Sequence, residues 1–77
     1  MQSYKTLHSL GEGESAVVGR LELEGGMRRR LRDMGLIEGT RVSCLQKSPL
    51  GDPVAFLIRG AVIALRSEDS SRVIIES

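Results

Sequence analysis

Apolar residues along the chain fall into short runs whose alternation or continuity is typical of β-strands. Strands are predicted over residues 16–23, 41–47, 54–58, 61–66 and 72–76. Gly19 predicts a bulge or a tight bend inside the first of these strands. Residues 1–5 are expected to be a loose end, which Leu7 and Leu10 attach to the core through a single turn.

One segment follows the period of a helix. Met27, Leu31 and Met34 are spaced i, i+4 and i+7, so they share one helix face. Gly35 follows directly and is placed to adopt the left-handed C′ conformation of a Schellman cap, in which Leu36 would contact Leu31. We therefore expect one short helix that packs its apolar face on the core.

Prolines, glycines and serines mark the connections between strands. Residues 49–53 contain two prolines, which cannot lie in a central strand, so this segment is predicted to be a loop. Residues 59–60 are a two-residue hairpin signal, and residues 67–70 are expected to form a single capped turn. Five short strands and one helix favour a mostly β fold, a small five-stranded, partly open barrel.

Composition limits the function classes. The chain has 77 residues, so we expect a single domain over 1–77. Its 11 basic and 10 acidic side chains give a net charge of +1, too balanced for nonspecific nucleic-acid binding. The sequence shows neither a signal peptide nor the roughly 20 apolar residues of a membrane span. A single cysteine favours a reducing, cytoplasmic location, and a single histidine in so short a chain argues against an enzyme.

Four arginines lie within five positions of the predicted helix: Arg28, Arg29, Arg30 and Arg32. The helical period places Arg28 beside Arg32, and Arg29 on the far side. These three are either a solvated face or a docking patch for an acidic partner. Arg30 lies at the edge of the apolar stripe, where its guanidinium is expected to bond backbone carbonyls of a neighbouring loop. Phosphate or nucleic-acid binding is disfavoured because the chain has almost no aromatic residues for stacking.

Four residues are weak candidates for metal ligands: His8, Glu12, Glu14 and Cys44. They do not show ligand spacing such as C-x-x-C or H-x-x-x-H. Cys44 lies on a predicted strand and is expected in the core, and His8 is expected at the surface. A weak site for a divalent transition metal, or a site shared between molecules, remains open.

Several short motifs resemble the ferrous iron transport protein A (FeoA) family. They are Arg30-Leu31, Met34-Gly35-Leu36, Gly39-Thr40, Pro49-Leu50-Gly51-Asp52-Pro53 and Ile63-Ala64-Leu65-Arg66. The resemblance covers about residues 6–76 and implies an SH3-like β-barrel in the cytosol. That barrel would assist a membrane ferrous-iron permease that carries a GTPase domain. The family has no catalytic residues to transfer, and the motif positions look structural.

The leading hypothesis is an accessory protein that binds and regulates such a permease. Its contacts would be Arg28, Arg29, Arg32 and, at the tip of the proline loop, Leu50. Residues 54–58 and 61–65 are apolar on both faces, so one face is covered by the helix or left for a partner or a second copy.

Two other functions are considered. A similar SH3-like domain belongs to metal-dependent transcriptional repressors, but no helix-turn-helix segment lies ahead of the predicted barrel. A small metal-binding protein is the third hypothesis.

Overall fold

The structure is a computed structural model and describes residues 5–76. Its strands are β1 (Lys5–Thr6), β2 (Ser15–Leu21), β3 (Arg41–Lys47), β4 (Val54–Ile58), β5 (Ala61–Leu65) and β6 (Val73–Glu76). Its helical elements are η1 (Leu7–Ser9), α1 (Gly25–Asp33) and the four-residue α2 (Ser67–Ser70).

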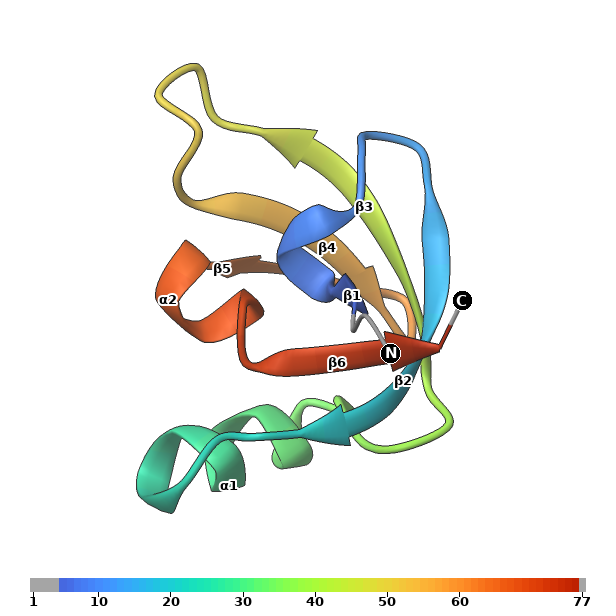
Figure 1. Cartoon of the computed structure of the whole chain (residues 1–77), viewed down its shortest axis with the longest axis vertical. Helices are drawn as coiled ribbons and strands as arrows, with labels where there is room; N and C mark the ends of the chain where they lie inside the picture. Colours follow the sequence, from blue (N-terminus) through green and yellow to red (C-terminus); the bar gives the residue numbers. More distant parts are fainter. Residues whose placement is uncertain (1–4, 77) are drawn as a thin grey trace, which may run out of the picture.

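The strands form one antiparallel sheet in the order β1-β6-β2-β3-β4-β5. The sheet curls around the core, with α1 at one end and the β3–β4 loop at the other (Figure 1). Within residues 5–76, β1 and β5 pair on one side only, so the barrel is partly open. The predicted mostly β fold is confirmed.

The N-terminal segment differs from the prediction. Lys5 and Thr6 add a sixth strand by pairing with Ile75 and Ile74 of β6. Lys5 was expected in the loose end; residues 1–4 of that segment lie outside the described residues. A two-residue strand has no period to detect, and it forms here because β6 offers an edge. The following turn attaches to the core as predicted, since Leu7 and Leu10 are buried.

One hydrophobic cluster fills the barrel. Its members are Leu7, Leu10, Val18, Leu21, Leu23, Leu31, Leu36, Val42, Cys44, Val54, Phe56, Ile58, Leu65, Val73 and Ile75. The period-2 pattern is clearest in β4, whose alternate residues are buried. In β5, by contrast, burial is confined to Leu65, with Ile63 half-buried. One strand with the apolar composition of a core strand therefore remains largely accessible.

The sheet has two register shifts, and the sequence predicts one of them but not the other. The register between β2 and β6 shifts between Val18 and Arg20, which confirms the bulge expected at Gly19. A second shift, between Cys44 and Gln46 in β3, has no glycine to mark it. The β4–β5 hairpin has positive φ at both Arg59 and Gly60, the geometry that a two-residue turn requires.

The C-terminus of α1 has the predicted Schellman cap. The Leu36 N–H donates to the Leu31 carbonyl (2.9 Å), and the Gly35 N–H donates to the Arg32 carbonyl (3.0 Å). Gly35 has φ +100°. A side chain there would also press on the Cδ of Arg59 in the β4–β5 turn. The cap therefore fixes both the end of the helix and its contact with the hairpin.

Replacing Leu31 with alanine removes the largest buried side chain of α1 from the core. The expected result is a loss of ~2–5 kcal/mol in the free energy of unfolding. Urea denaturation followed by circular dichroism measures it, with the exposed position Glu38→Ala as a control that changes stability by less than ~0.5 kcal/mol. A Leu31→Ala protein with wild-type stability would contradict the core assignment.

Gly35→Ala should lower the free energy of unfolding by about 1–3 kcal/mol, because alanine is strained at positive φ. The contact with Arg59 involves a flexible side chain and should contribute less. Adding Arg59→Ala should consequently recover only a minor part of the loss. In the same helix, Gly26→Ala has open space and ordinary φ, and should gain about 0.5–1 kcal/mol. Full recovery in the double mutant would assign the effect to the steric contact instead.

Candidate functional site

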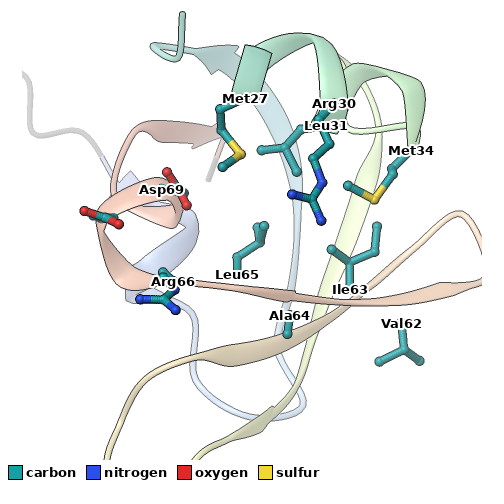
Figure 2. A pocket seen from close by; sticks show the side chains of 11 residues that line it. Met27, Arg30, Leu31, Met34, Val62, Ile63, Ala64, Leu65, Arg66 and Asp69 are labelled. Carbon is teal, nitrogen blue, oxygen red and sulfur yellow. The ribbon is translucent and has the colours of Figure 1, made fainter. Parts of the chain in front are cut away.

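A groove of about 620 Å³ runs between α1, β5 and α2. It is lined by Met27, Arg30, Leu31, Met34, Val62, Ile63, Ala64, Leu65, Arg66, Glu68 and Asp69. Figure 2 shows the apolar side chains of α1 pointing toward Ile63 and Leu65 of β5 across this groove. The groove arises because α1 covers the core beside β5 without closing over the strand. We call it the α1–β5 groove.

Arg30 lies in the α1–β5 groove and has no partner among residues 5–76. Its side chain reaches from α1 toward β5 (Figure 2). It is exposed, and within residues 5–76 it makes neither a hydrogen bond nor an ion pair. A guanidinium with five donors is thus available to a ligand that enters the groove.

The expected bonds to backbone carbonyls are made by a different arginine. The Nη1 of Arg28 donates to the carbonyls of Leu21 (3.2 Å) and Leu23 (3.4 Å). Both carbonyls belong to the segment that leads from β2 into α1, which lies on the Arg28 side of the helix. The assignment of these bonds to Arg30 was therefore wrong, and Arg28 has a structural role.

The rest of the predicted basic face is solvent-exposed. Arg29 and Arg32 are both exposed. Arg28 and Arg32 line a shared hollow of about 260 Å³ next to the exposed side chain of Ile37, as their helical spacing predicted. The cationic surface of α1 thus borders the α1–β5 groove on one side and an apolar residue on the other.

Leu50 lies far from this surface. It is 94% exposed at the tip of the β3–β4 loop, at the opposite end of the molecule from α1 (Figure 1). The loop is braced: the Gly51 N–H donates to the Ser48 carbonyl (2.8 Å), and Asp52 Oδ1 accepts from the Ser67 N–H (2.8 Å). The predicted contact residues therefore form two separate surfaces.

The remaining motif positions make structural bonds. The Gly39 N–H donates to the Val18 carbonyl (2.8 Å), and Thr40 Oγ1 donates to the Gly35 carbonyl (2.9 Å). Ser48 Oγ donates to the carbonyl of Pro53 (2.6 Å), whose peptide bond with Asp52 is cis. These positions hold turns and loops in place, which explains why they carry the sequence pattern.

Within the described part of the chain, the four metal candidates do not form a ligand cluster. Glu12 accepts a bond from the Lys47 N–H (2.7 Å), and Glu14 from the Gly11 N–H (2.6 Å). His8 Nδ1 lies 3.5 Å from the hydroxyl of Ser70. Among residues 5–76, no cluster of three or more histidine, cysteine or acidic side chains could hold a metal ion.

Cys44 is fully buried, as expected, in the barrel core. Burial raises the pKa of its thiol above the ordinary value of 9.0; nearby Lys47 opposes the shift, and the carboxylates of Glu12 and Glu14 add to it. A thiol with a raised pKa is a poor nucleophile and a poor metal ligand at neutral pH.

Across residues 5–76, the helices are all too short and too polar to cross a bilayer.

Comparisons with known proteins identify relatives along almost the whole chain. A family model for the FeoA domain matches residues 5–77. A fusion of Fe(2+) transport protein A with the Fe(2+) transporter FeoB, from Porphyromonas gingivalis, is 36% identical over 70 residues. That match covers 91% of this chain and 8% of the fusion protein. The chain thus spans less than a tenth of this relative.

Two solved structures have the same fold. Iron(II) transport protein A of Clostridium thermocellum is 32% identical, with a TM-score of 0.89 over 94% of this chain and 44% of that one. FeoA of Stenotrophomonas maltophilia, an SH3 domain protein solved in complex with zinc, is also 32% identical. Its TM-score is 0.77 over 94% of this chain and 89% of that protein. The predicted SH3-like barrel is confirmed.

The buried thiol gives a test of the Cys44 assignment. The native protein at pH 8 should react with a disulfide reagent at least tenfold more slowly than the protein unfolded in guanidinium, because the thiolate is disfavoured and inaccessible. A second thiol placed by Glu38→Cys, at an exposed position, should react at once. Since the folded pKa is raised, stability should fall as the pH rises above 9, and Cys44→Ala should remove that component. Fast native labelling of Cys44 would contradict the assignment.

Proposed function

The chain belongs to the FeoA family, and we propose that it is an accessory protein of ferrous-iron uptake that binds the cytosolic part of a membrane iron permease. The observation that carries this proposal is the Porphyromonas gingivalis relative, in which a homologous segment and the transporter FeoB form one polypeptide. Domains fused in one protein are held at high effective concentration, which favours a contact between them. Transport itself is assigned to the permease and its GTPase domain.

The chemistry of the groove supports binding instead of catalysis. Its lining contains apolar, cationic and acidic side chains, but neither histidine, cysteine nor serine. It therefore offers surface and charge to a partner without a nucleophile and its base. In this proposal the protein acts in the cytoplasm and is not an enzyme.

Ferrous iron is the cargo of the permease in this proposal. The Stenotrophomonas maltophilia relative was solved with zinc, which bears on that protein. In this chain two of the four candidate ligands already bond backbone amides, and a third is buried. Because these side chains are already hydrogen-bonded or buried, they support a role in which this chain binds no metal itself.

The cationic side of α1 is the proposed docking face. Arg29 and Arg32 extend into solvent, and Arg32 lies in the last turn of α1, where the helix dipole favours a cation. Since Arg28 is engaged with the β2–α1 segment, the docking charge rests on Arg29 and Arg32, with Arg30 in the adjoining groove. The Leu50 tip, at the other end, would form a second, independent contact.

Reversing both docking charges tests this face. The double variant Arg29→Glu, Arg32→Glu should bind the purified cytosolic part of the permease at least tenfold more weakly, because two attractions become repulsions. A pull-down or a titration with and without GTP measures it. The matched control is Lys5→Glu with Arg41→Glu, which reverses the same number of charges on β1 and β3. Unchanged affinity of the α1 variant would sink the docking face, and failure of the wild-type chain to bind would sink the function.

A further inference from the structure

Strand β5 is an unprotected sheet edge. Its sequence, Ala61-Val-Ile-Ala-Leu65, contains neither a charged residue nor a proline. Natural sheets usually protect such an edge with charges, prolines, bulges or a short length. The opposite edge, β1, is only two residues long and contains Lys5. The five-residue, uncharged edge of β5 is thus the one able to accept another strand.

The β4–β5 register shows which backbone groups are free. Ile58 and Ala61 flank the two-residue turn and form its closing hydrogen-bonded pair. Because hydrogen-bonded pairs alternate in an antiparallel ladder, Ile63 and Leu65 also bond toward β4. The N–H and C=O groups of Val62 and Ala64 consequently point away from β4, to the open side.

The α1–β5 groove runs along this same edge. Residues 62–65 all line it, although their side chains alternate between the face that points toward α1 and the face that points away (Figure 2). An added strand would therefore lie in the groove. Every second side chain of that strand would face the half-buried Met27 and Met34 of α1.

Charge determines the chemistry of the occupant. Arg30 lies over the groove with no partner among the described residues, so a carboxylate on the incoming segment would satisfy it. At the α2 end of the groove the two acidic residues Glu68 and Asp69 outnumber the one basic residue, Arg66, so this end is acidic on balance. That end would repel the same carboxylate and so favours its position beside Arg30.

A second copy of this chain does not fit this requirement. Two β5 strands paired antiparallel about Ile63 would bring no acidic side chain from residues 61–65 to Arg30. In that register Arg66 of one copy would lie opposite Gly60 of the other, so it would gain no acidic partner either. The occupant is therefore a segment of a different protein.

We propose that the free edge of β5 takes up an extended, largely apolar segment of a partner protein as an added strand, with an acidic side chain of that segment paired to Arg30. Only the identity of the partner, the cytosolic part of the permease, rests on the proposed function.

Amide hydrogen exchange gives the direct test. With the purified cytosolic part of the permease bound, exchange at Val62 and Ala64 should slow at least tenfold. Exchange at Ile63 and Leu65, which already bond to β4, should change little. A second probe is a synthetic nine-residue peptide of alternating valine and threonine with a central glutamate, and its control has a central lysine. The glutamate peptide should shift the Val62 and Ala64 amide resonances at lower concentration than the lysine peptide.

Two pairs of variants separate the backbone from the charge. Ala64→Pro removes one outward N–H without removing a bond to β4, and should weaken binding of the glutamate peptide at least tenfold, whereas Ala64→Ser should not. Arg30→Glu changes an exposed residue, so the fold is retained, and it should reverse the preference between the two peptides. Arg30→Lys should preserve that preference.

The outcomes distinguish this inference from the proposed function. Binding of the permease part without protection of Val62 and Ala64 would overturn the strand addition and keep the function. Peptide addition at β5 without permease binding would keep the strand addition and overturn the function. If neither the permease part nor the peptide protects Val62 and Ala64, the strand addition is overturned. It is also overturned if the two amides are protected only because the chain self-associates, which sedimentation experiments would detect.

Discussion

The attachment of α1 to an open barrel is the constraint on which the rest of the structure depends. Leu31 and Leu36 anchor the C-terminal half of the helix in the core, and the glycine cap between them fixes where the helix ends. In the N-terminal half of the helix, Arg28 donates hydrogen bonds to the carbonyls of Leu21 and Leu23, where the chain leaves β2. A nine-residue helix held at both ends has one rotational setting, which turns Arg30 toward β5 and leaves Arg29 and Arg32 in solvent.

The sequence predicted the features that depend only on residues close together in the chain. The spacing of Met27, Leu31 and Met34 and the following Gly35 gave the helix, its buried face and its cap, since all of these depend on neighbours within one turn. The strands over 41–47 and 54–58 were also predicted with their observed bounds. The short strand at Lys5 was missed because its pairing depends on β6, seventy positions away in the sequence.

The candidate site was less predictable for the same reason. Which arginine bonds the carbonyls of Leu21 and Leu23 depends on where the end of β2 lies relative to the helix, and tertiary packing sets that position. The groove requires α1 and β5 to lie side by side, and no periodicity encodes that distance. A signal did exist in the sequence: the strand over 61–65 is as apolar as a core strand, and the structure buries little of it. The excess of apolar residues in this strand was the one indication in the sequence that its edge could contact a partner.

The braced β3–β4 loop gives Leu50 a property that exposure alone does not. Asp52 accepts hydrogen bonds from both the N–H and the hydroxyl of Ser67, so the loop is tied to the first residue of α2. An exposed leucine on an untethered loop would lose conformational entropy when a partner captures it. Here much of the backbone ordering has already occurred during folding, so the loop that carries Leu50 is preorganised. Such a tip can contribute to affinity by being rigid, even though it buries nothing in the free protein.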